Sequence, residues 1–363
     1  MITNTAENIG YIYCMKSISI LNQPAKLRHP SFVFHMPLKK CVLFFLFAAC
    51  INFSEAQLLT GFTATGNYNE QEITIKDHWK NVVLHINAPE HFNTKGKTFL
   101  IFYALPNGNS IEWTKGKKMQ QGDDWHFDIQ HIAAQTRFIR NTDQQNNYIV
   151  TYLMAEQKSW PSWKHNTPDS IHLIKNIVDS ITSLFKTFNP AVILSSHSGG
   201  GSFVFGFIDA VNEIPNNIER IIFIDSDYGY VDSMHKTKLV NWLQKSTKNK
   251  LVVLAYNDSV VIYNGKPLVS ATGGTWYRSR LMQRDLSSTF PFVTTTDTAF
   301  IVHHALHERI TMILKENPNG LIYHTEQVAK NGFILSMFTC TKFNRKKHFT
   351  YFGDRVYENF IGD

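Results

Sequence analysis

The stretch that decides the fold is residues 191–207, which read Ala-Val-Ile-Leu-Ser-Ser-His-Ser-Gly-Gly-Gly-Ser-Phe-Val-Phe-Gly-Phe. It begins with an apolar run of strand length, passes through a Gly/Ser segment and continues as an apolar segment compatible with a helix. A serine at the tip of such a sharp strand-to-helix turn has an exposed hydroxyl, and the next N–H and the helix N-terminus can stabilise an oxyanion. Ser198 occupies that place, with the small residues Ser196 and Gly200 two positions away on either side.

The stretch resembles the nucleophile elbow of the α/β-hydrolase family, with Ser196 in place of the first glycine of G-x-S-x-G. An ordinary Gly/Ser-rich turn is the alternative. A phosphate-binding loop fits less well, because the Lys-Ser/Thr ending and a G-x-G-x-x-G are both missing. The resemblance implies an α/β fold with a mostly parallel central sheet, helices on both faces, and a serine esterase or lipase activity of an exported bacterial type.

Apolar patterning along the chain predicts alternating strands and helices, which favours a mostly parallel sheet. We expect strands at residues 71–76, 81–86, 97–104, 148–154, 191–194, 221–224, 251–255 and 321–328, and helices within 124–140, 168–185, 234–245 and 303–316. This order also resembles that of α/β-hydrolases. It predicts one domain over residues 57–363, with an insertion at about 259–300 that is either part of a substrate-covering cap or a surface loop.

The N-terminal residues have the composition of a targeting segment. Residues 36–56 combine a short basic region, an apolar core and a small-x-small site that ends at Ala56, so they predict a secretory signal peptide cleaved after Ala56. Residues 1–35 are then expected to be an upstream extension from a misplaced start codon, or disordered. Processing as a lipoprotein at Cys50 is the alternative. The expected location is secreted or periplasmic, with membrane contact only through the signal peptide or a lipid anchor at Cys50.

Charge, cysteine content and metal-ligand motifs argue against nucleic-acid binding, an internal disulfide and a metal site. The formal net charge is +7, and the basic excess beyond residue 56 is mild and scattered, which argues against nucleic-acid binding. Cleavage after Ala56 would leave Cys340 as the only cysteine, so no internal disulfide could form. The sequence contains no H-x-x-x-H with a partnering acid and no C-x-x-C, so no metal site is expected.

A serine hydrolase also needs a base, an acid and oxyanion donors. With Ser198 as nucleophile, the resemblance places the histidine after the last strand, but only His348, near the C-terminus, follows the predicted strand 321–328. His324, in or at the end of that strand, is therefore the candidate, and a packed core histidine is its alternative reading. Asp258 is the preferred acid because it follows the predicted strand 251–255, and Asp225 is the alternative. His303, His304 and His307 are assigned to the helix predicted at 303–316.

The oxyanion hole is expected to combine the N–H of Gly199 with the loop after the third strand, at Asn107, Gly108 and Asn109. His197 and the loop tryptophans Trp113 and Trp276 are candidate substrate contacts. Trp160 and Trp163 are likewise expected in loops, where a tryptophan either stacks on a ligand or anchors the loop.

These observations predict an exported serine hydrolase that cleaves a small-molecule or glycan-linked carboxylic ester through an acyl-enzyme, with no cofactor. Two alternatives stay open. One is a catalytically degenerate hydrolase fold that acts as a binding protein of the cell envelope. The other is a peptidase or amidase on the same scaffold.

Overall fold

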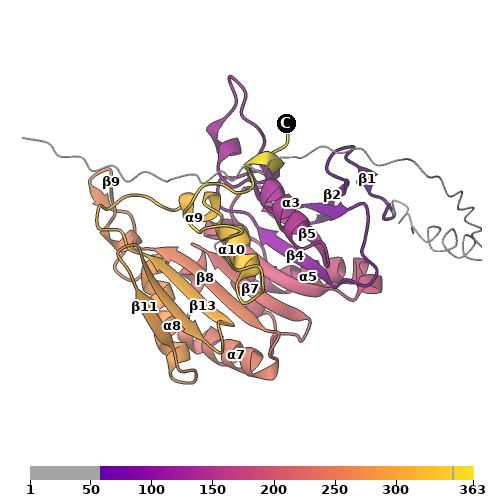
Figure 1. Cartoon of the computed structure of the whole chain (residues 1–363). Coiled ribbons are helices and arrows are strands. Elements are labelled where there is room, and N and C mark those ends of the chain that lie inside the picture. The colour runs from indigo at the N-terminus through magenta and orange to yellow at the C-terminus, as the bar shows by residue number, and fades with distance from the viewer. Residues whose placement is uncertain (1–57, 346) are drawn as a thin grey trace, which may run out of the picture. The chain divides into compact units, whose positions relative to one another are not determined.

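The computed structural model describes residues 58–345 and 347–363 (Figure 1). Its strands are β1 Thr63–Ala64, β2 Glu70–Trp79, β3 Val82–Pro89, β4 Thr98–Ala104, β5 Asn147–Ala155, β6 Ala191–His197, β7 Ile218–Ile224, β8 Lys250–Tyr256, β9 Ile262–Tyr263, β10 Lys266–Pro267, β11 Val293–Thr296, β12 Phe300–Ala305 and β13 Ile310–Lys315. The signal peptide, its cleavage site and Cys50 lie outside the described residues.

The α-helices are α2 Ile111–Lys115, α3 Ile132–Thr142, α4 Trp160–Asn166, α5 Ser170–Leu184, α6 Gly201–Asp209, α7 Asp232–Lys245, α8 Thr275–Ser287, α9 Glu326–Ala329 and α10 Gly332–Phe338. Short 3₁₀ turns are η1 Trp125–Asp128, η2 Lys186–Phe188, η3 Ser198–Gly200, η4 Asp227–Gly229, η5 Asp258–Val260 and η6 Glu358–Phe360. None of the helices described between residue 58 and the C-terminus is long and apolar enough to cross a membrane.

Eleven strands form one sheet in the order β1-β2-β3-β5-β4-β6-β7-β8-β13-β12-β11. The strands from β5 through β4, β6, β7 and β8 to β13 are parallel, and antiparallel strands complete both ends. The predicted fold class is therefore confirmed. Because the central strands are parallel, the segments that follow β4, β6, β7 and β13 leave the sheet at one edge, where sites of open α/β sheets form.

Side chains of the central strands alternate between two hydrophobic layers. In β4, Leu100 and Phe102 pack on the side covered by α4 to α8, whereas Ile101 and Tyr103 pack on the side covered by α3 and α10. Figure 1 shows α3 and α10 together in front of the sheet. Strands buried on both faces explain the nearly continuous apolar runs in the sequence.

The C-terminal third differs from the prediction. The expected helix at 303–316 is the hairpin of β12 and β13, and the expected last strand at 321–328 is a loop that leads into α9. The predicted helical segment 124–140 is divided into η1 and α3. Trp160 and Trp163, expected in loops, lie in α4 and are buried.

The segment 259–300, expected as an insertion, contains two elements of the main fold, helix α8 and the edge strand β11 of the large sheet. Its helix α8 contacts β8 and β13, and Met282 and Leu286 of this helix are fully buried in the hydrophobic layer. Residues 259–274, with the small hairpin of β9 and β10, come before α8 and form the part outside the main sheet.

Candidate active site

Ser198 lies at the turn from β6 to α6. Its backbone has φ +53°, a conformation that non-glycine residues rarely adopt and that is often found at functional sites. The side chain is half-buried and lines a cavity. The strand, the strained serine and the helix that follows are the parts of a nucleophile elbow.

The small residues around Ser198 are required by close neighbours. A Cβ on Gly200 would collide with the main-chain oxygen of Ala104, and one on Gly201 with that of Ser226. Ser196, which replaces the usual first glycine, is tolerated because its Oγ has a partner, the Ser226 Oγ at 2.8 Å. The structure thus accommodates a serine at the position where the motif usually has its first glycine.

The loop after β4 lies directly against the elbow, since a Cβ on Gly199 would collide with the side chain of Asn107. Two N–H groups of this loop are already bonded: that of Gly108 donates to the Lys158 carbonyl at 2.8 Å, and that of Asn109 to the Pro106 carbonyl at 3.4 Å. The N–H of Asn107 makes no hydrogen bond within residues 58–345 and 347–363. Of the three predicted loop donors, the geometry therefore favours Asn107.

His324 and Asp225 form a direct pair. Nδ1 of His324 is hydrogen-bonded to the Asp225 carboxylate, and Oδ1 of that carboxylate accepts from Thr275 Oγ1. Asp225 is fully buried, whereas 26% of the His324 side chain is exposed. With Nδ1 bound to a buried carboxylate, the other ring nitrogen of His324 is the one available for proton transfer.

Asp258, the preferred acid from the sequence, has a different partner. Its Oδ2 accepts from the N–H of Thr275 at 2.8 Å, at the first turn of α8. Burial, and secondly the charge of Asp225, raise the pKa of Asp258 to about 6. Asp258 therefore holds the start of α8 and does not contact His324. The structure pairs His324 with Asp225, the alternative acid.

His197 is buried and does not line the cavity beside Ser198, which differs from the expected substrate contact. Its Nε2 lies 3.1 Å from the main-chain oxygen of His324, and its Nδ1 lies 3.3 Å from Gln130 Oε1. Burial, and next the charge of His324, lower the pKa of His197 well below its usual value. It is a neutral residue that fixes the loop carrying His324.

The candidate residues follow three parallel strands. Ser198 comes after β6, Asp225 after β7 and His324 after β13, which is the chain order Ser, Asp, His of α/β-hydrolases. The chain has the α/β-hydrolase fold.

A cavity of about 680 Å³ opens beside Ser198 and Gly199. Its wall has an apolar part made by Pro161, Phe205, Tyr228, Val231 and Met234, and a polar part made by Asn107, Lys164, Ser202, Asp209, Ser226 and His235. Most of these residues come from α4, α6, η4 and α7. Sequence reasoning missed this wall, because only the fold brings these elements to the elbow.

The two tryptophans named as substrate contacts lie elsewhere. Trp113 stacks on His126, with ring centroids 4.3 Å apart, and Lys158 covers the same indole. Trp276 is 8% exposed and lines a different cavity, between α8 and β12. Neither lines the cavity at Ser198. The described residues also hold no group of three or more His, Cys, Asp or Glu that could bind a metal ion.

No family model and no curated protein matches this sequence. Among solved structures, the chain is similar to a cold-adapted esterase from an Arctic intertidal metagenomic library, at 8% identity over 74% of this chain and 92% of the esterase, with a TM-score of 0.35. The feruloyl esterase module of Clostridium thermocellum has 8% identity over 74% and 87% of the two chains and a TM-score of 0.44. Thermogutta terrifontis esterase 2 has 11% identity over 79% and 98%, with a TM-score of 0.38. Because these similarities are weak, the fold of this chain is assigned from its own strand order and nucleophile elbow.

Proposed function

We propose that this protein is a serine hydrolase that cleaves a carboxylic ester, with Ser198 as nucleophile, His324 as base and Asp225 as the acid that orients it. The observation that carries the proposal is the pairing of a buried Asp225 with Nδ1 of His324 at the sheet edge where Ser198 adopts its strained turn. A nucleophile, a base and an orienting acid are what acyl transfer requires.

In the proposed reaction, Ser198 Oγ attacks the carbonyl carbon while its proton passes to Nε2 of His324. Asp225 stabilises the imidazolium that forms. The oxyanion accepts from the N–H groups of Gly199 and Asn107, each such donor contributing about 3–4 kcal/mol in related sites. His324 then protonates the leaving alcohol, and a water activated by the same imidazole releases the acid from Ser198.

The cavity limits the substrate. A space of about 680 Å³ with an apolar wall fits a small-molecule ester, or an ester carried on a glycan, better than a polypeptide chain. A catalytically degenerate binding protein would need no base, whereas His324 follows β13, the last strand of the sheet along the chain, and is paired with Asp225. A panel of p-nitrophenyl esters and matching anilides separates an esterase from an amidase.

Labelling by a fluorophosphonate probe is the direct test. Wild type should be labelled and Ser198→Ala should not, whereas Ser202→Ala, a serine of the same cavity, should label as wild type does. An unlabelled wild type, or a labelled Ser198→Ala protein, would refute the proposal.

The proposed place of action is outside the cytoplasm, on the basis of residues 36–56. N-terminal sequencing of the protein from the producing cell should begin at Gln57. An N-terminus at a lipid-modified Cys50 would indicate the lipoprotein route instead.

A further inference from the structure

A second cavity lies at the opposite edge of the sheet, where the parallel strands begin. It has a volume of about 400 Å³ and its wall includes residues at the start of β4, β5, β7 and β8 and the end of α10. The catalytic candidates follow the other ends of strands, so this cavity is separate from the site at Ser198.

The wall of this second cavity is strongly cationic. Five basic side chains line it against two carboxylates: Lys97, Arg220, Lys248, Lys250 and Lys342, with Asp143 and Glu219. Both carboxylates already have partners. Glu219 pairs with Lys97, and Asp143 accepts from the Tyr148 hydroxyl at 2.6 Å and from Asn146 at 2.7 Å.

Arg220 is 5% exposed and forms no ion pair within the described part of the chain. Its guanidinium donates to the main-chain oxygens of Ser336 at 2.6 Å and Thr339 at 3.0 Å, at the C-terminal end of α10. These carbonyls hold the side chain in place but carry only partial negative charge. A buried charge without a counter-ion is costly, so this arginine favours an anion nearby.

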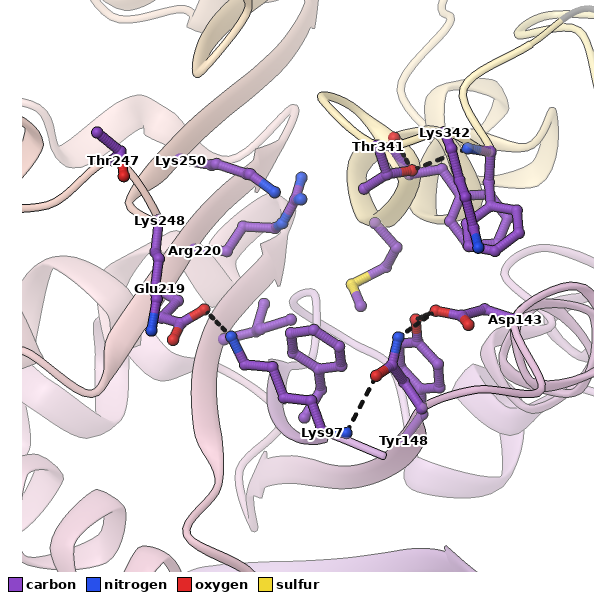
Figure 2. Close-up of a pocket in the computed structure, with 16 residues that line it drawn as sticks. Lys97, Asp143, Tyr148, Glu219, Arg220, Thr247, Lys248, Lys250, Thr341 and Lys342 are labelled. Carbon is purple, nitrogen blue, oxygen red and sulfur yellow. Dashed lines mark hydrogen bonds and ion pairs between the residues drawn. The ribbon is translucent and has the colours of Figure 1, made fainter. Parts of the chain in front are cut away.

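Lys250 lies beside Arg220, and Figure 2 shows the two charged ends directed toward the same space, with Lys342 across it. The ammonium group of Lys250 has no hydrogen bond or ion pair to any described residue. Burial, and next the charge of Arg220, lower the pKa of Lys250 to about 8. The lysine is therefore mostly charged at pH 7, and an anion between the two cations would relieve their repulsion.

The remainder of the wall is aromatic and apolar. Phe99 and Tyr148 stack with ring centroids 5.2 Å apart, and Phe338 and Phe343 lie 5.2 Å apart. Ile193 and Met337 complete this surface. A cavity of this size with an apolar lining and a few placed charges is typical of a site for a small organic molecule.

We propose that this cavity binds a small aromatic anion, with its carboxylate or phosphate group between Arg220 and Lys250 and its ring against Phe99 and Tyr148. The size, the aromatic lining and the paired cations together favour this class over a bare inorganic ion or a neutral molecule.

Isothermal titration calorimetry of the full chain with phenyl phosphate tests the proposal, with benzoate, inorganic phosphate and benzyl alcohol as comparison ligands. Saturable 1:1 binding of phenyl phosphate or benzoate is expected, the tighter of the two identifying the head group, with weaker binding of inorganic phosphate and none of benzyl alcohol. Lys250→Met should weaken binding by about tenfold or more, because a charge-assisted contact is lost. Lys250→Arg should largely preserve it.

Two further variants serve as controls. Lys266→Met removes an exposed lysine of β10, and Lys164→Met removes the cation of the cavity beside Ser198; both should bind phenyl phosphate as wild type does. Equal melting temperatures would show that the Lys250 variants are folded. Absence of saturable binding, undiminished binding by a folded Lys250→Met protein, equal binding of benzyl alcohol, or loss of binding in Lys164→Met would each overturn the proposal.

Discussion

The imidazole of His197 connects the elbow to His324: its Nε2 lies 3.1 Å from the main-chain oxygen of His324, and the two rings stack with centroids 4.8 Å apart. His197 is the residue directly before Ser198. One side chain therefore fixes the spacing between the proposed nucleophile and the loop that carries the proposed base.

Replacing His197 should impair catalysis through this spacing. His197→Leu removes the donor to the His324 carbonyl, and we expect kcat/KM on p-nitrophenyl acetate to fall by about 10–100-fold, as for other residues that orient a reacting group. His197→Gln keeps an N–H donor and should recover part of the loss. Because positioning is affected and not the ester-binding wall, kcat should fall more than KM rises. A Leu variant with unchanged kcat would contradict this role.

Asp225 and Asp258 can be separated by one matched pair of variants. Asp225→Asn should lower kcat by about 10⁴-fold, because the amide cannot stabilise the imidazolium and favours the wrong tautomer. Asp258→Asn should leave kcat within a few-fold, since an asparagine still accepts from the N–H of Thr275. Steady-state kinetics of both variants decide the matter, and the reverse ranking would restore Asp258 as the acid.

The raised pKa of Asp258 makes a prediction about stability. An aspartate of an unfolded chain titrates near 4, and that of Asp258 in the folded protein titrates at about 6, so the folded state binds the proton more tightly. The contribution of Asp258 is therefore complete below pH 4 and is lost as pH rises to 6. The amide that Asp258→Asn introduces does not titrate. The free energy of unfolding of this variant, measured in urea, should therefore rise by about 2 kcal/mol relative to that of wild type as the pH is raised from 4 to 6. A difference that stays constant with pH would contradict the shift.

The contact between Gly199 and Asn107 can be tested by a double substitution. Gly199→Ala places a methyl group against the Asn107 side chain, which should displace the oxyanion donors and lower kcat by about 100-fold or more. Adding Asn107→Gly removes the obstructing side chain but keeps the main-chain N–H, and should restore much of the activity.

Gly200→Ala, alone and combined with Asn107→Gly, is the control for this double substitution. Its methyl group would meet the main-chain oxygen of Ala104, which no substitution removes, so Asn107→Gly should give no recovery there. Equal recovery in both backgrounds would show that the Asn107 side chain is not the obstacle at Gly199.

The sequence predicts a structural feature correctly where consecutive residues contain all of its elements. The run from Ala191 to Phe207 carries its strand, turn and helix in consecutive residues, and the alternation of elements gave the sheet class. Residues 303–316 predict a helix and not the hairpin of β12 and β13, because the turn contains no glycine, asparagine or proline. Leu306, His307 and Glu308 all adopt positive φ there, a conformation that these residue types do not predict.

The acid and the cavity wall could not be read from the sequence for a different reason. Asp225 and Asp258 both follow parallel strands, and only the tertiary structure shows that Thr275 lies between them and that His324 reaches Asp225. Lys164 comes from α4 and Met234 from α7, two helices that are far apart in the sequence. Their proximity depends on helix packing, which leaves no local pattern.

Strand β7 begins at one cavity and ends at the other site: Arg220 is its third residue, and Asp225 directly follows its last. With a rise of about 3.3 Å per residue, the two side chains are joined by a rigid span of roughly 17 Å. A disruptive substitution inside that span, at the buried Ile222 or Phe223 for example, is expected to disturb both ends together. Variants found there by random screening are therefore expected to lose ester turnover and anion affinity in parallel, whereas Ser198→Ala and Lys250→Met should each affect only one of them.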